Sequence, residues 1–245
     1  MQERIDSLQN PWTDRDVEEH WDRIAEIYVK ENTRVKKAHD QRFRESIGFL
    51  EIMPGMKILN ISSRDAGADD YIKADQPHSE VIHAEISGGL MKVAESLRPY
   101  IQQIKLTSYS SLPFEDHYFD RILSLETLEH AEDPLAYLQE LYRVSKDNAR
   151  MVLSCPPATS EIPYRFYTFF FGGHGEGPHR FPSSRKVKEL LKMTGWKLLI
   201  HRGTLLIPAG PVIVQDFGEK VINKFQGTCI AELGIRQFYI CEKTG

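Results

Sequence analysis

The chain has 245 residues, of which 41% are hydrophobic and 27% charged, values typical of a globular protein that buries its own core. Its formal net charge is −4. Proteins that bind nucleic acid usually carry a basic stripe, whereas the short cluster Arg34, Lys36 and Lys37 is typical of a solvated helix face. Nucleic acid is therefore not expected as a partner.

The three cysteines, Cys155, Cys229 and Cys241, are too few and too widely spaced for a disulfide framework or a zinc site. No apolar run reaches the ~18 residues of a membrane span. The polar first ten residues do not resemble a secretory signal. We therefore expect a cytoplasmic protein without a membrane span, and no heptad repeat indicates an oligomeric state.

Apolar side chains at helical spacing predict two N-terminal helices, at residues 13–31 and 35–50, with Thr13 or Asp14 capping the first. From residue 56, short apolar strands alternate with helices. The expected strands are residues 56–61, 80–86, 104–107, 119–125 and 150–154, and the expected helices are residues 66–75, 90–97 and a third that begins at Pro134 after its N-cap Asp133.

Asp147-Asn148 is expected to turn the chain into strand 150–154. Residues 158–182 then interrupt the alternation with an aromatic run from Tyr164 to Phe171 and a glycine-rich stretch. The remaining expected elements are a helix capped by Ser183 or Ser184 and stopped by Gly195, a strand at 196–200, a helical segment at 211–225 and a closing strand at 237–241.

Strands that alternate with helices predict an α/β fold with a parallel sheet and right-handed crossovers. Ligands of such sheets bind outside the carboxyl ends of the strands. Glu85 ends the second strand, where a lone carboxylate can accept both hydroxyls of a ribose or can simply be a solvated charge. The loops expected to form the site follow Ile61, Ile86, Thr107, Leu125 and Ser154.

A specific run of motifs follows: Leu112-Pro113-Phe114, then Phe119-Asp120, Glu129-His130 and Asp133-Pro134. With the stretch from residue 112 to 144, the SCPP that ends the fifth strand and the segment 179–196, the chain resembles the class I S-adenosylmethionine-dependent methyltransferases of the small-molecule branch. The resemblance implies a Rossmann-like three-layer sandwich with a seven-stranded sheet in the order 3-2-1-4-5-7-6, the last strand antiparallel.

The resemblance also implies S-adenosylmethionine as cofactor. Glu85 would hold its ribose, the loop after the first strand would receive its methionine part, and residues Ser108 to Ser110 would flank its adenine. Trp21 and Tyr28 would cover the cofactor or simply pack in the core. The residues expected to bind the cofactor are Asn60, Ser62, Arg64, Gly67, Glu85, Ile86, Ser108, Tyr109, Ser110 and Glu126.

The chain departs from the family pattern in two places, the first loop and residue 108. The glycine-rich first loop of the family corresponds here to residues 60–66, where Ser62, Arg64 and Ala66 replace the glycines and Gly67 follows one place later. Arg64 either binds the cofactor carboxylate, or faces solvent beside a narrowed pocket, or marks a different ligand. Ser108 stands where the family usually has an aspartate that contacts adenine.

The candidate catalytic residues are His130, His174 and His179, since a base is needed where the acceptor must lose a proton. His130 alternatively shapes the pocket. The alternative for the glycine-rich segment with His174, Glu176 and His179 is a simple turn. Two histidines and a carboxylate could also bind a metal, but we assign none.

We expect methyl transfer to an oxygen or nitrogen atom of a small-molecule acceptor, within EC class 2.1.1. The alternative is an inactive, methyltransferase-like binding or scaffold protein that has lost the cofactor. A nicotinamide-dependent dehydrogenase is disfavoured because no G-X-G-X-X-G motif follows the first strand.

We interpret residues 1–245 as one domain, with a helical cap at 1–54 and a cofactor-binding core at 55–157. Insertions at 158–182 and 209–227 are expected near the acceptor site. The aromatic run from Tyr164 to Phe171 would form either an acceptor lid or a helix packed on the core.

Overall fold

The computed structural model describes residues 9–34, 36–162, 164, 177–208 and 210–244. His174, Glu176 and most of the aromatic run therefore lie outside the described residues.

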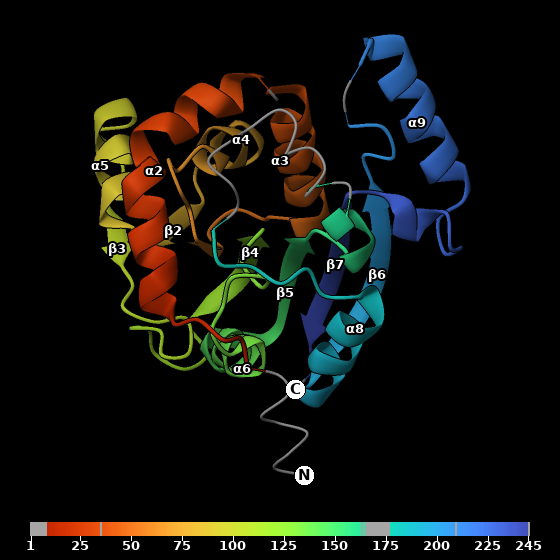
Figure 1. The fold of residues 1–245 in the computed structure, drawn as a ribbon. Coiled ribbons are helices and arrows are strands. Elements are labelled where there is room, and N and C mark those ends of the chain that lie inside the picture. Colours follow the sequence, from red (N-terminus) through yellow and green to blue (C-terminus); the bar gives the residue numbers. More distant parts are fainter. Residues whose placement is uncertain (1–8, 35, 163, 165–176, 209, 245) are drawn as a thin grey trace.

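One seven-stranded sheet forms the centre of the molecule, in the order β3-β2-β1-β4-β5-β7-β6 (Figure 1). All neighbouring pairs from β3 to β5 are parallel, and β7 is antiparallel to both β5 and β6, so the expected sheet is confirmed. The strands are β1 (Lys57–Ile61), β2 (Glu80–Glu85), β3 (Gln103–Lys105), β4 (Phe119–Leu125), β5 (Ser145–Cys155), β6 (Trp196–Thr204) and β7 (Arg236–Lys243).

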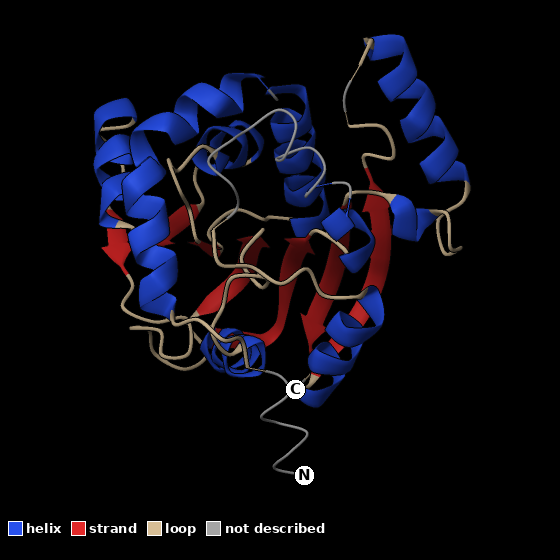
Figure 2. Cartoon of the chain, viewed as in Figure 1, coloured by secondary structure: helices blue, strands red, loops and turns tan. Residues whose placement is uncertain are grey.

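Helices cover both faces of the sheet (Figure 2). They are α2 (Asp14–Arg34), α3 (Lys36–Leu50), α4 (Ala68–Asp75), α5 (Gly88–Leu97), α6 (Pro134–Val144), α8 (Ser184–Met193) and α9 (Val212–Lys224), with short 3-10 helices at Ala158–Ser160 and Ala231–Leu233.

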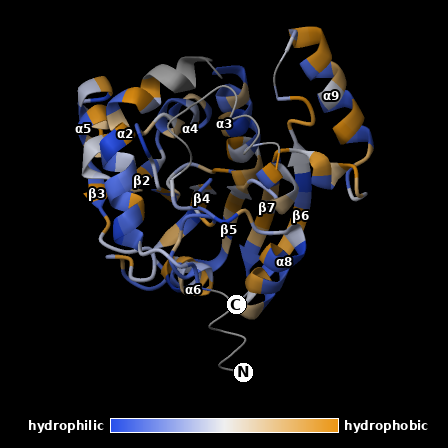
Figure 3. Ribbon diagram, in the orientation of Figure 1, coloured by the Kyte–Doolittle hydropathy of each residue, from blue (hydrophilic) through white to orange (hydrophobic). Residues whose placement is uncertain are grey.

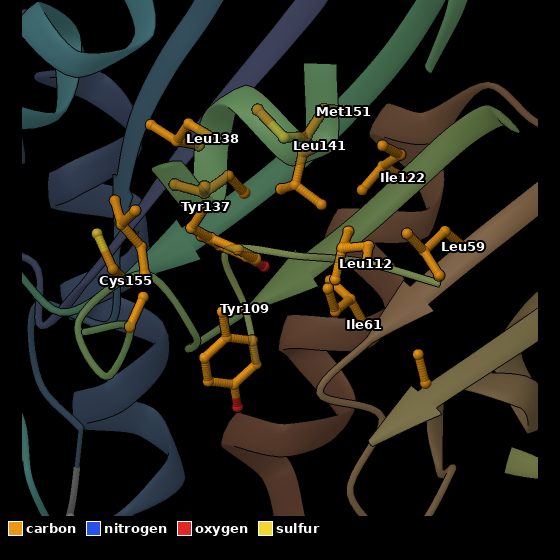
Figure 4. Close-up of a cluster of buried hydrophobic side chains, with 14 of the residues drawn as sticks. Leu59, Ile61, Tyr109, Leu112, Ile122, Tyr137, Leu138, Leu141, Met151 and Cys155 are labelled. Atoms are coloured by element: carbon orange, nitrogen blue, oxygen red, sulfur yellow. The ribbon is translucent and has the colours of Figure 1, made fainter. Parts of the chain in front are cut away.

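Alternate residues of each strand point to opposite faces, which divides the core into two clusters. Leu59 and Ile122 belong to the larger cluster, with α2, α5, α6 and α8, and Figure 4 shows part of it around Leu138 and Leu141 of α6. The smaller cluster, with α3 and α4, contains their sequence neighbours, Ile58 of β1 and Leu123 of β4. The central strands are therefore buried on both faces, which is why helices pack on both sides of the sheet.

The ends of the helices follow local chemistry. Asp133 Oδ1 accepts hydrogen bonds from the backbone N–H groups of Leu135 and Ala136, which confirms it as the N-cap of α6. Ser87 Oγ accepts the N–H of Leu90, so α5 begins two residues before the expected start.

The expected turn at Asp147-Asn148 falls inside β5, which spans Ser145 to Cys155. Asn148 has a φ of 62°, and the pairing with β4 shifts register between Phe119 and Arg121. The turn-forming residues therefore form a bulge between two paired parts of β5, the first at Ser145 and the second from Arg150 onward.

The α9 helix lies apart from the other helices, beside the edge strand β6 (Figure 1). Several of its apolar side chains face solvent, among them Phe217 and Ile213, the latter with 82% of its surface exposed. Figure 3 shows this apolar colouring along the helix. Among the described residues, no helix has both the length and the apolar character that crossing a membrane requires.

Candidate functional site

The loop after β1 keeps a glycine-like backbone without glycine. Ser62, Arg64 and Ala66, the three residues at the glycine positions of the family pattern, have φ values of 51°, 54° and 59°. A side chain in this region costs on the order of 1 kcal/mol or more, so neighbouring contacts must hold the loop in place. One such contact is the Ser63 N–H, which donates to the Ala84 carbonyl of β2 at 3.0 Å.

The carboxylate of Glu85 supplies further contacts to this loop. Its Oε2 accepts the backbone N–H of Arg64 at 2.7 Å, and its Oε1 accepts the N–H groups of Ile86 and Ser87, both at 2.9 Å. The residue exposes 0% of its surface. The acid expected to hold a ribose therefore lies at the expected place, at the end of β2, but binds three backbone N–H groups of the chain itself.

Arg64 is buried, with only 8% of its surface exposed. Its guanidinium carbon lies 3.8 Å from the centroid of the Trp21 ring, which belongs to α2, and its Nη2 lies 3.4 Å from the Glu126 carbonyl oxygen. The alternative in which Arg64 faces solvent is therefore wrong. A cation over the indole face is a favourable arrangement that also covers the apolar part of the side chain.

The segment expected to flank the adenine is bound by α2. Asp14 Oδ2 accepts hydrogen bonds from Ser108 Oγ and from the Tyr109 N–H, both at 2.7 Å. Ser110 N–H donates to Ser108 Oγ at 3.0 Å. Tyr109 is fully buried, and its hydroxyl accepts a hydrogen bond from Ser62 Oγ at 3.0 Å. Burial raises the pKa of Tyr109 above its usual range, so this hydroxyl is neutral.

A second aspartate ties α2 to the loop after β2. Asp22 Oδ1 accepts hydrogen bonds from Ser87 Oγ at 2.6 Å and from the Gly89 N–H at 2.8 Å. Sequence reasoning considered Asp14 only as a helix cap and did not include Asp22. The available signal was that both carboxylates share a helix with the buried Trp21, although no local pattern identifies their distant partners.

Three other expected cofactor ligands have different partners. Asn60 Nδ2 lies 3.0 Å from Nδ1 of His83, whose Nε2 lies 3.1 Å from Asp69, so Asn60 is part of a buried network between β1, β2 and α4. Ile86 is fully buried. The N–H of Gly67 donates to Asp65 at 3.3 Å.

Glu126, another residue expected to bind the cofactor, forms an ion pair with an arginine of the chain itself. Its Oε1 accepts hydrogen bonds from Arg236 Nε at 3.0 Å and from Ser154 Oγ at 2.8 Å. Burial alone would raise the pKa of Glu126, but the charges of Arg236 and Arg42 outweigh it and lower the pKa.

His130 lies beside the Trp21 ring, edge to face, with the ring centroids 5.7 Å apart. Burial, assisted by the charge of Arg64, lowers its pKa to about 3, so the imidazole is neutral near pH 7. Its Nδ1 lies 2.8 Å from the Pro178 carbonyl oxygen, which assigns the proton to Nδ1 and leaves Nε2 as the acceptor. His130 exposes 1% of its surface.

His179 lies near His130 and contributes to the lowering of the His130 pKa. Its Nδ1 lies 2.8 Å from the Gly177 carbonyl oxygen and its Nε2 3.8 Å from Glu161. His174 and Glu176 cannot be placed, because they lie outside the described residues. Within the described part of the chain, no group of three or more histidine, cysteine, aspartate or glutamate side chains is arranged to hold a metal ion.

The strand order, the antiparallel β7 and the acid that ends β2 together define the fold of the class I methyltransferases. Residues 66–153 match the family described as methyltransferase domain. Fold and family match support a class I S-adenosylmethionine-dependent methyltransferase of EC class 2.1.1, with S-adenosylmethionine as its methyl donor and cofactor.

Three known proteins are similar to this chain in sequence or in structure. Demethylmenaquinone methyltransferase of Streptomyces avermitilis is 25% identical over 222 residues, which cover 82% of this chain and 93% of that protein. The ubiquinone/menaquinone biosynthesis C-methyltransferase UbiE of Burkholderia cenocepacia is 28% identical over 115 residues, 44% of this chain and 46% of that protein. A Haloferax volcanii protein solved in complex with the Trm112 methyltransferase activator has a TM-score of 0.68 at 14% identity, covering 94% of this chain and 98% of that chain.

The described conformation does not fit an adenosyl group over the strand ends. A ribose can reach Glu85 only if a neighbour moves, because the carboxylate is fully buried and accepts three backbone N–H groups. Arg64 and Tyr109 are also buried at this position. In this conformation the Glu85 carboxylate and the side chains of Arg64 and Tyr109 are therefore enclosed by contacts within the chain itself.

Proposed function

We propose that this chain transfers a methyl group to an apolar small-molecule acceptor at the carboxyl edge of its sheet. The observation that carries this proposal is the backbone of the loop after β1. Its positive φ values at Ser62, Arg64 and Ala66 keep the form that glycine normally supplies, and Glu85 remains bonded to it.

The two curated relatives support a carbon atom as the methylated position. One is named for demethylmenaquinone and the other as a C-methyltransferase of quinone biosynthesis. The sequence alone favoured an oxygen or nitrogen acceptor. We therefore propose an electron-rich ring as the acceptor, with carbon preferred over oxygen or nitrogen.

The properties of His130 favour a structural role over proton abstraction. A general base works best when its pKa lies near the working pH, whereas the pKa of His130 is about 3. We propose that His130 holds the loop of Pro178 against α2, through its hydrogen bond to the Pro178 carbonyl and its contact with Trp21. His179 stays a candidate base.

The test uses S-adenosylmethionine with a ¹³C-labelled methyl group and a panel of quinols, phenols and amines. We expect label in a quinol product, and the ¹³C chemical shift distinguishes a C-methyl from an O-methyl or N-methyl group. Glu85→Gln should abolish turnover. Glu80→Gln, an exposed substitution at the opposite end of the same strand, should preserve it. Turnover only with amines would contradict the acceptor class.

The buried state of Glu85 favours a second candidate function, a methyltransferase-like binding or scaffold protein. In that case the three hydrogen bonds to Glu85 are permanent and the loop is purely structural. Absence of any calorimetric signal with millimolar S-adenosylhomocysteine, for the wild type and for variants that open the site, would establish this function in place of the first.

A further inference from the structure

Arg64 is the largest of the three side chains that replace glycine in the loop after β1. We propose that Arg64 is the residue that controls access to the cofactor site, and that S-adenosylmethionine binds only after the guanidinium leaves the Trp21 ring. The inference rests on the proposed methyltransferase function and names the residue that regulates its cofactor site.

The position of Arg64 supports this proposal. Its own N–H is bonded to the Glu85 carboxylate at 2.7 Å, so the residue is attached to the group that would bind a ribose. Its side chain extends from there to Trp21 at 3.8 Å and to the Glu126 carbonyl at 3.4 Å. The arginine thus spans from the end of β2 to the end of β4, across the carboxyl edge of the sheet.

Helix α2 holds Trp21 over Arg64. Asp14 binds the loop after β3, and its Oδ1 also accepts the N–H of Glu132 at 3.1 Å. Asp22 binds the loop after β2. The helix is therefore fastened on both sides of Trp21 to loops that surround the site, and Figure 1 shows α2 alongside α5.

Contacts with surrounding residues, and not the local preference of arginine, hold Arg64 in this arrangement. Arg64 has a φ of 54°, which an arginine adopts only when its surroundings impose it. The side chain is long and flexible, so it can leave without rearrangement of the sheet. The closed state is therefore one of two states whose balance the cofactor can shift.

The experiment measures S-adenosylhomocysteine binding by calorimetry for the wild type and Arg64→Gly. Only molecules in which the site is open bind the ligand, so the apparent affinity is reduced by the fraction of open molecules. Removing the arginine should therefore tighten binding by about tenfold or more. Asn148→Gly is the matched control, because it replaces another residue of positive φ, 62°, that is exposed and distant from the site. It should bind like the wild type.

A second variant tests the same proposal if Arg64→Gly does not fold. Asp22→Asn keeps the arginine but weakens the hydrogen bonds of α2 to Ser87 and Gly89, and it should also tighten binding. Thermal unfolding of each variant reports whether it is folded.

Each outcome decides the inference. Tighter binding by both variants supports it. Equal affinity of wild type and Arg64→Gly overturns it while leaving the proposed function intact. Weaker binding by Arg64→Gly also overturns it, since the arginine would then be a ligand of the cofactor. Absence of binding by all proteins overturns both the inference and the methyltransferase function.

Discussion

Arg236 Nε donates a hydrogen bond to Glu126 Oε1 at 3.0 Å, which joins the first residue of β7 to the residue after β4 across 110 positions of sequence. Ser154 at the end of β5 donates to the same oxygen. This pair closes the carboxyl edge of the sheet where the parallel strands meet the antiparallel β7.

Arg236→Met should destabilise the protein by about 1–3 kcal/mol, because it leaves the Glu126 carboxylate largely buried without its cation. The free energy of unfolding, measured by urea denaturation, checks this. The double variant Glu126→Gln/Arg236→Met should recover part of the loss, since neither charge is then left alone. A single variant as stable as the wild type would contradict the role of the pair.

His130 makes the stability depend on pH. Its pKa is about 3 in the folded protein, below the ordinary value, so the unfolded chain binds a proton that the folded chain excludes. Its stabilising contribution is complete above about pH 6.5 and is lost as the pH falls towards about 3. The expected slope from this residue is about 1.4 kcal/mol per pH unit in that window.

The slope of unfolding free energy against pH should therefore decrease in His130→Asn. The control His117→Asn removes an exposed histidine and tests whether the loss of any histidine has the same effect. His39, whose pKa burial lowers to about 2, contributes a separate slope of the same sign in every variant. An unchanged slope in His130→Asn would show that its imidazole is accessible to protons.

Two glycines should respond in opposite ways to substitution by alanine. A Cβ at Gly203 of β6 would overlap the backbone carbonyl oxygen of Ala231, so Gly203→Ala should destabilise by about 1–3 kcal/mol. A Cβ at Gly48 of α3 meets no atom of the described residues within 4 Å outside the adjoining backbone of its own helix, so Gly48→Ala should stabilise by about 0.5–1 kcal/mol. Thermal unfolding of both variants tests the pair, and equal shifts would refute it.

Asp133→Ala should destabilise the protein by about 1 kcal/mol through loss of the two hydrogen bonds that start α6. Asp133→Asn keeps a side-chain oxygen at this place and should retain most of the stability. Chemical denaturation distinguishes the two. A loss of equal size in both variants would mean that the charge, and not the cap, matters.

Much of the fold could be predicted because its signals are local. The caps Asp133 and Ser183, the stop at Gly195 and the short apolar strands all act within a few residues of themselves. Asp147 and Asn148 also act locally, because they interrupt the pairing of β5 between Ser145 and Arg150.

The site was predicted less completely. Glu85 lies where the strand pattern placed it, but the identity of its partners depends on the loop of Arg64, 21 positions earlier. Asp22 reaches Ser87 across 65 positions. Contacts at such separation leave no periodic or capping pattern in one sequence.

The amino-acid sequence by itself determined the alternation of strands and helices and the position of the acid at the end of β2, because periodicity and turn chemistry operate over neighbouring residues. Only the tertiary structure decided that Arg64 lies under Trp21 and that Glu85 is fully buried. The physical reason is that burial and hydrogen bonding of a charged group depend on which distant segments surround it. In this chain α2 supplies those surroundings for Arg64.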